Sequence, residues 1–405
     1  MRISTNSIFE SGVSQLGTLQ SNLAKTQMQL STNRRMLTAA DDPIASARAL
    51  EVTQSQSINT QFATNRQNAR SSMSQVELAL AGTTSLIQDM QTIATEAGNG
   101  ALSQADRESL ATELEGRLDD LLGVANTADG AGGYLFSGFK STIQPFSQTS
   151  TGAQYHGDQG QRVLQVGSSR QVAVSDSGSS VFENNPTGNG TFVTRAVGAN
   201  TGSGIVSGGS VTDAALLTGH NYEVRFAIAG TPPATTYTVN DTTTGLDVTA
   251  ALPFESGKQI AFDGMTFDVE GAPADGDIIT VEPSQKQSLF ATVTNLITAL
   301  RGPAQGAAGM ARLTNDLNEA HTNLGAALDN VLGVRASIGS RMKELDYLDS
   351  AGQDLNIQYE STLSDLQDLD TVKAISQFAQ QQFTLEAAQK SFKSMSGLSL
   401  FNFIG

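Results

Sequence analysis

The chain has 405 residues, 39% of them hydrophobic and 16% charged, which is too apolar for a disordered polyelectrolyte and long enough for two or three domains. Its formal net charge of −16, from 24 basic and 40 acidic residues, argues against nucleic acid or an anionic membrane as the main partner. The absence of cysteine excludes disulfides, thiolate metal sites and a cysteine nucleophile.

The first forty residues carry a thin hydrophobic repeat. Apolar residues recur every seven positions at Phe9, Leu16, Leu23, Leu30 and Leu37. The positions three residues later are Gly12, Leu19, Thr26 and Asn33, so the stripe is narrow and half polar. Because so thin a stripe gains little from packing alone, we expect residues 1–40 to become helical mainly within an assembly. An ordinary frayed terminal helix is the alternative.

A helix break is predicted at 38–43. Asp41 and Asp42 precede Pro43; Asp42 is a suitable N-cap, and proline suits the first position of the next helix. Three further helices are predicted from hydrophobic spacing and end signals. They cover 43–97, the stretch from Ser103 to Ala125, and a stretch that Ser284 caps and Gly302 closes.

The middle of the chain changes to a composition typical of strands. Seven of the nine prolines lie in 141–285, and short runs rich in threonine and valine end at glycine, proline or aspartate. These runs predict strands at 192–197, 222–228, 237–239, 265–269 and 277–282. Because both flanks are predicted to be helical, we expect them to pack against each other. The β-rich segment is then expected to leave and rejoin the helical part at one point.

The second helical flank carries a stronger repeat. Met310, Leu317, Leu324, Val331, Ile338 and Leu345 recur every seven residues, and Leu313, Ala320, Ala327, Val334 and Leu348 occupy positions three residues after members of this set. This near-complete pattern predicts a long helix with a coiled-coil-like buried seam.

No catalytic or cofactor motif is found. The sequence has no P-loop, no HExxH and no GxSxG, and its three histidines, His156, His220 and His321, are far apart. Between Asp263 and Asp277 there are five carboxylates without EF-hand spacing, so we expect a solvated face rather than a calcium site. His156 is interpreted as a turn residue and His321 as solvent-facing. The sequence therefore predicts no enzyme, no cofactor and no metal.

Several segments resemble a known family. LSTNRRMLTAADDPIASARAL at 30–50 resembles the N-terminal signature of bacterial flagellins and flagellin-like proteins. GGYLFSGFKSTIQPF at 132–146 and YHGDQGQRVLQV at 155–166 are similar to the flagellin-like hook-associated proteins of the hook–filament junction. The stretches 335–348 and 362–404 resemble the C-terminus of that family, and LSLFNFIG at 398–405 differs from the Leu-Leu-rich tail of flagellin.

The resemblance implies an exported structural protein. It implies export by the flagellar type III apparatus without a cleaved signal, which agrees with the lack of a basic stretch followed by an apolar one in the first thirty residues. It also implies termini that stay mobile in the monomer and pair as helices on assembly, and an export chaperone at the C-terminal helix. No stretch approaches the ~20 apolar residues of a membrane span, so neither a membrane nor a nucleic acid is expected as a partner.

We expect an α+β multi-domain rod, with a long coiled-coil-like helical bundle from both termini and an inserted β-rich domain. Residues 1–41 with 360–405 are expected to be terminal assembly helices, disordered in the monomer. Residues 42–185 with 284–359 are expected to form a helical core with β-hairpins near 134–180, and 188–283 an outer β-rich domain.

The expected function is structural. The chain is expected to form a homo-oligomeric ring at the hook–filament junction of the extracellular flagellum, between a neighbouring hook-associated protein and flagellin, and so to allow filament attachment and motility. A flagellin filament subunit is the alternative within this class, and a secreted adhesin or surface enzyme with its activity in 188–283 is the alternative of another class. The expected assembly residues are Phe9, Leu16, Leu23, Leu30, Leu37, Asp41, Asp42, Pro43, Leu366, Leu369, Phe378, Phe383, Leu385, Phe392, Leu398, Leu400, Phe401 and Phe403.

Overall fold

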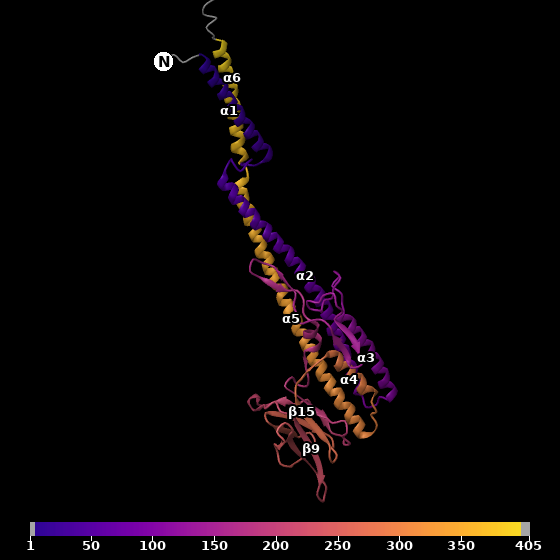
Figure 1. Ribbon diagram of the computed structural model, residues 1–405. Coiled ribbons are helices and arrows are strands. Elements are labelled where there is room, and N and C mark those ends of the chain that lie inside the picture. Colours follow the sequence, from indigo (N-terminus) through magenta and orange to yellow (C-terminus); the bar gives the residue numbers. More distant parts are fainter. Residues whose placement is uncertain (1–4, 398–405) are drawn as a thin grey trace, which may run out of the picture. The chain divides into compact units, whose positions relative to one another are not determined.

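The computed structural model describes residues 5–397 (Figure 1). The chain divides into two compact units, one formed by the residues up to Thr64 and from Tyr347 onward, the other by Asn65–Asp346. Helices occupy both flanks and strands the middle, so the expected α+β class is confirmed. The long helices are α1 (Thr5–Thr32), α2 (Pro43–Ala97), α3 (Gln104–Ala125), α4 (Leu289–Arg301), α5 (Gly306–Gln367) and α6 (Thr371–Gly397).

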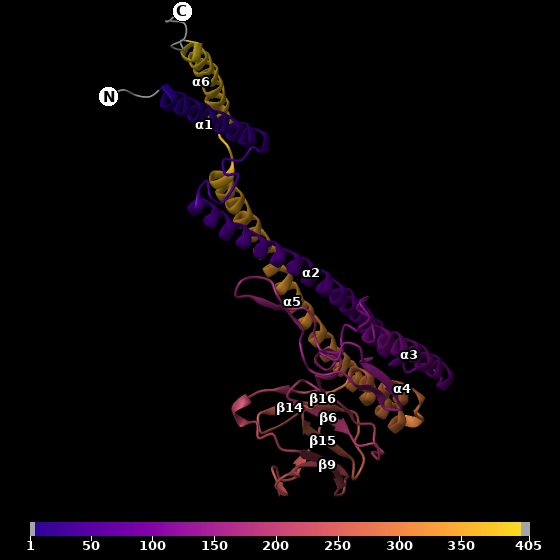
Figure 2. The ribbon, with the colours of Figure 1, turned by 45° about the horizontal axis from the view of Figure 1, so that its top comes forward.

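Within the unit 65–346, α5 buries the seam that its heptads predict. Leu317, Leu324, Val331, Ile338 and Leu345 are at most 5% exposed, whereas Met310 and Val334 are half-buried. Leu348 is also half-buried, but it lies on the part of α5 that belongs to the other unit. Arg335 on α5 donates hydrogen bonds to Glu77 (3.0 and 2.7 Å) and Thr84 (3.2 Å) on α2, so the two helices lie side by side there (Figure 2). The facing side of α2 buries Met73, Val76, Leu80, Ile87 and Met90.

The helices α3 and α4 pack against each other, and their caps test two predictions. Ser103 Oγ accepts a hydrogen bond from the Asp106 N–H (3.3 Å), and the Asp106 carboxylate accepts one from the Ser103 N–H (2.9 Å), so the predicted start is confirmed as a capping box. Ser284 as cap of the later helix is wrong, because that helix starts at Leu289 after the short strand β16 (Lys286–Gln287). Ser284 Oγ instead donates to the Thr187 carbonyl (2.7 Å). Gly302 closes α4 as predicted.

The glycine-rich motif at 132–146 folds around Asp158. The Asp158 carboxylate accepts hydrogen bonds from the backbone N–H groups of Phe139 (2.9 Å), Gly160 (2.8 Å) and Lys140 (3.1 Å), which lower its pKa. Gly138 has φ of 70°, and a Cβ at this position would overlap the Asp158 Oδ1 atom. Two segments that were both singled out in the sequence, 132–146 and 155–166, are therefore joined through Asp158.

An aromatic cluster anchors this region on α4. Phe136, Phe146, Phe182 and Phe290 are fully buried, with neighbouring ring centroids 5.0 to 5.7 Å apart. The surrounding short elements are the hairpins β1 (Phe146–Thr149) with β2 (Gly152–Tyr155) and β3 (Val163–Gln165) with β4 (Gln171–Ala173), and the short helix η1 (Ser179–Glu183).

The segment after Thr187 is a pair of antiparallel sheets around one core. One sheet has the order β11-β10-β9-β15-β6, with β12 also paired to β10, and the other has β13-β14-β7, with β8 also paired to β14. The core joins both sheets through Phe192, Tyr222, Val224, Phe226, Phe262, Phe267 and Val281, and all five predicted strands are present. The elements are β5 (Asn185–Pro186), β6 (Phe192–Ala196), β7 (Ile205–Val206), β8 (Ser210–Val211), η2 (Ala214–Leu216), β9 (Tyr222–Ala229), β10 (Ala234–Asp241), β11 (Leu246–Asp247), β12 (Leu252–Pro253), β13 (Gln259–Phe262), β14 (Met265–Glu270) and β15 (Ile278–Pro283).

The β-rich segment leaves and rejoins the helical part at one point. The Thr187 N–H donates to the Gln285 carbonyl (2.9 Å), and β5 pairs with β16. Across the contact with α5, Asn315 accepts from the Val206 N–H (2.8 Å) and Asn323 from the Gly188 N–H (2.9 Å). The contact therefore includes hydrogen bonds from the backbone of the β-rich segment to side chains of α5.

The acidic stretch forms the expected solvated face only in part: Glu270 and Asp275 are exposed, but Asp277 is not. Asp277 is only 4% exposed and accepts hydrogen bonds from the N–H groups of Thr201, Gly202 and Ala274 at 2.8 to 3.0 Å. That prediction is wrong at this position, because the carboxylate ties two loops together. His321 is exposed, as predicted. Over residues 5–397, no helix combines the length and the hydropathy that a membrane crossing requires.

Candidate functional site

The two terminal helices form an antiparallel pair. At one end, the rings of Phe9 on α1 and Phe392 on α6 lie 5.1 Å apart. At the other end, the Leu369 N–H donates to the Asn33 carbonyl (3.2 Å). The beginning of α1 therefore lies beside the end of α6, and Figure 1 shows the indigo and yellow helices running together.

The seam of this pair follows a seven-residue repeat on both helices. On α1 the less exposed positions include Gly12, Leu16, Leu19, Leu23, Thr26 and Leu30, which is the repeat read from the sequence. On α6 they are Ala374, Phe378, Gln381, Leu385, Ala388 and Phe392, a matching repeat that sequence reasoning missed. Its alternate members are Ala374, Gln381 and Ala388, which carry too little apolar surface to signal a stripe. The seam is narrow, and only Thr26 and Ala374 within it are fully buried.

Apart from Asp41, Asp42 and Pro43, the predicted assembly residues fall into four groups. Leu16, Leu23, Leu30, Phe378, Leu385 and Phe392 are half-buried between α1 and α6, and Leu37, Leu366 and Leu369 are half-buried at the helix break. Phe9 and Phe383 are 51% and 74% exposed, so they remain available to a partner. Leu398, Leu400, Phe401 and Phe403 lie outside the described residues.

The outward faces of the pair carry further exposed apolar side chains. Their exposure runs from 49% at Val13 to 75% at Val372. Apolar side chains gathered at this density on a narrow helix pair are typical of a surface that a partner covers. They lie off the heptad stripe, which is why the repeat did not single them out. The set is Val13, Met28, Val372, Ile375 and Met395.

The break between α1 and α2 is held by its two aspartates. Asp41 accepts hydrogen bonds from Lys25 Nζ (2.6 Å) and from the N–H groups of Thr38 and Leu37 (3.0 Å each), and these interactions hold its pKa well below the usual value. Asp42 accepts from the Ala45 N–H (3.0 Å), so it caps α2, which begins at Pro43 as predicted. That hydrogen bond lowers the pKa of Asp42, and its ion pair with Arg35 (3.2 Å) adds to the effect.

We expect the break to loosen in acid. The folded-state pKa of each aspartate lies below its unfolded value, so the stabilisation is complete above about pH 4 and is lost as the pH falls through the folded-state pKa. Amide hydrogen exchange at Leu37 and Thr38, corrected for the intrinsic pH dependence, should therefore lose protection below about pH 4. Asp41→Asn should show the unprotected rate at neutral pH. Equal protection in both chains at pH 7 would contradict this role for Asp41.

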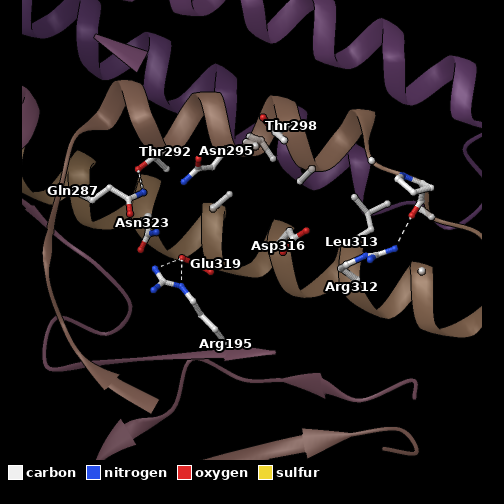
Figure 3. Close-up of a pocket in the computed structure, with 17 residues that line it drawn as sticks. Arg195, Gln287, Thr292, Asn295, Thr298, Arg312, Leu313, Asp316, Glu319 and Asn323 are labelled. Carbon is white, nitrogen blue, oxygen red and sulfur yellow. Dashed lines mark hydrogen bonds and ion pairs between the residues drawn. The ribbon is translucent and has the colours of Figure 1, made fainter. Parts of the chain in front are cut away.

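Away from the terminal helices, a cleft of about 490 Å³ with a mixed polar and apolar lining lies where α4, α5 and β6 meet (Figure 3). Arg195 on β6 donates to Glu319 on α5 (2.9 and 2.6 Å), and this hydrogen bonding raises the pKa of Arg195. None of the predicted assembly residues that the structure describes lines this cleft, and Arg195 is the lining residue through which the β-rich segment is held to α5.

Comparison with known proteins identifies relatives over nearly the whole chain. Residues 3–141 match the family described as the bacterial flagellin N-terminal helical region. The flagellar hook-associated protein 3 of Salmonella typhimurium is 29% identical over 402 residues, which cover 99% of each chain.

Solved structures agree with this similarity. The flagellar hook associated protein-3 of Legionella pneumophila superposes with a TM-score of 0.74 and 34% identity, covering 78% of this chain and 98% of that one. FlgL of Xanthomonas campestris gives a TM-score of 0.71 and 28% identity, covering 77% and 99%.

Proposed function

The chain belongs to the flagellar hook-associated protein 3 family, and from this premise we propose that it is the structural subunit that joins the hook to the filament of a bacterial flagellum. Within the chain, the antiparallel pair of terminal helices carries the proposal. A narrow half-polar seam with exposed apolar faces stabilises a monomer weakly and offers two sides for packing against other subunits.

In this proposal the three parts of the chain have different tasks. Residues 1–41 with 360–405 form the assembly end, and 42–185 with 284–359 form the helical core. The outer part, 188–283, is a β-rich domain that does not make the joint. The hydrogen bonds of Val206, Gly188 and Arg195 with α5 support this division, because a contact made through such polar groups suits an attached module better than a shared core.

The partners follow from the same surfaces. We propose a homo-oligomeric ring that contacts a hook-associated protein on the hook side and flagellin on the filament side. Before assembly, an export chaperone would cover α6, where Val372, Ile375 and Phe383 are each more than half exposed. The protein acts outside the cell as part of the flagellum, and we propose that it travels there through the type III apparatus without a cleaved signal.

A structural role of this kind requires no catalysis. The β-rich segment 188–283 gives little support to the alternative of an adhesin or a surface enzyme. Of its aromatic residues, Phe192, Tyr222, Phe226, Phe262 and Phe267 are at most 7% exposed, and Tyr237 and Phe254 are partly buried against them. They fill the core between the two sheets and are not displayed as a platform for a sugar or a peptide.

A deletion strain tests the proposal. Cells that lack this chain should assemble hooks without filaments and release unpolymerised flagellin into the medium, and both defects should disappear when the gene is restored. Hook-bearing cells are counted by electron microscopy, and flagellin in the medium is measured by immunoblot. Loss of the flagellin band itself would assign the chain to the filament, and normal filaments would overturn the junction role.

A further inference from the structure

A groove of about 530 Å³ lies at the helix break, within the unit that contains both termini. Its apolar wall consists of Met36, Leu37, Ala39, Pro43, Ala47 and Leu50, and Ala49 lies buried at its base. Arg34, Thr53 and Gln367 supply a polar rim. Leu50 is 70% exposed, although the groove offers it apolar surroundings. The groove is therefore large enough to take several side chains and is open to a partner.

The sequence contains a segment of matching chemistry. Residues 398–405 read LSLFNFIG, in which five apolar side chains are separated by Ser399 and Asn402. Apolar side chains fit the wall of the groove, and the two polar ones fit its rim. Leaving five such side chains in water costs free energy, which burial in a partner would recover at about 25 cal/mol per Å².

The same chain cannot supply this segment to its own groove. The helix α6 starts next to Gln367, which lines the groove, and runs 27 residues to Gly397, a length of about 40 Å at 1.5 Å per residue. The eight residues after Gly397 span at most about 28 Å when fully extended. Leu398 to Ile404 of one chain therefore fall short of the groove of that chain.

We propose that the groove binds the apolar segment 398–405 of a second copy of this chain. The proposal rests on the assembly role given above and specifies one contact of it. In this proposal the helix break also recognises a partner, since Asp41 holds Leu37 in the wall of the groove and Asp42 caps the helix α2 that supplies Pro43, Ala47 and Leu50.

The absence of native cysteine makes the contact directly testable. A chain carrying Leu50→Cys and Phe403→Cys is expressed in the deletion strain, and flagella are isolated and oxidised. We expect a ladder of covalently linked chains on a non-reducing gel, because each groove would hold the neighbour's segment. The matched control, Leu78→Cys with Phe403→Cys, places one cysteine at another exposed leucine (76%) outside the groove and should remain monomeric.

The remaining outcomes decide against the proposal. A faster-migrating monomer would show an intramolecular link, and a doubly substituted chain that still seats filaments without forming a ladder would show an empty groove. Neither result touches the junction role, which the deletion strain tests separately. As a second measurement, Leu50→Asp should leave the melting temperature unchanged, since Leu50 is exposed, but should reduce filament-bearing cells roughly tenfold. Normal filament counts with Leu50→Asp would also overturn the proposal.

Discussion

Val331→Asp should unfold the helical core of the unit 65–346. Val331 is fully buried in the α5 seam, and so is Leu324, which Leu324→Asp tests in the same way. Each change removes an apolar side chain worth about 2 kcal/mol of burial and leaves a carboxylate without a partner, for a total of ~3–5 kcal/mol or more. That is a large part of the ~5–15 kcal/mol by which a folded protein is stable.

Circular dichroism at 222 nm during heating measures this effect. The melting temperature should fall by about 10 °C or more, since 1 kcal/mol corresponds to ~2–4 °C for a unit of this size. Leu332→Asp is the matched control, because Leu332 is the next residue on α5 and is 42% exposed. It should melt within a few degrees of the unchanged chain. Similar melting of all three variants would show that the seam does not hold the core.

The regular parts of the fold could be predicted because their periodicity is local. The α5 repeat places Leu317, Leu324 and Val331 on one face whatever the partner is, and the buried positions agree with it. The cap at Ser103 and the stop at Gly302 are equally local, since each depends on residues within one turn. Strand sites such as 222–228 are bounded by turn residues and were found for the same reason.

The errors occur where distant segments decide the outcome. Ser284 could have capped a helix, but its hydroxyl is used by the Thr187 carbonyl on the segment where the β-rich part begins. Asp277 sits in an acidic stretch and yet is buried, because the N–H groups of Thr201, Gly202 and Ala274 converge on it. Neither contact produces a recognisable pattern among the residues next to Ser284 or Asp277 in the sequence.

The assembly surface was only partly accessible to sequence reasoning. A heptad identifies the side of a helix that packs, so Leu16 and Leu23 were found, but within this chain they are half-buried against α6. Exposed residues such as Val13 and Val372 have no periodic signal, because a surface for other subunits need not follow the seam of the pair. Only the pairing of the two helices separates the inner from the outer face.

Removing 188–283 should leave filament attachment intact. Thr187 and Gln285 are hydrogen-bonded neighbours, so a short Gly/Ser linker can join the ends at a small cost in loop closure. The α5 side chains exposed by the deletion include Asn315, Glu319 and Asn323, which water can satisfy. We therefore expect a melting temperature within a few degrees of the full chain and near-normal counts of filament-bearing cells.

Truncation of the chain after Gly397 should abolish filament attachment. It removes Leu398, Leu400, Phe401 and Phe403 and no described contact of the unit 65–346, so that unit should melt normally while filament-bearing cells fall close to zero. Both chains are compared in the deletion strain by counting filaments on hooks, with export checked by immunoblot of the medium. If the truncated chain seats filaments and the chain without 188–283 does not, the joint is made by the β-rich part. In that case, the exposed faces of α1 and α6 must serve another partner.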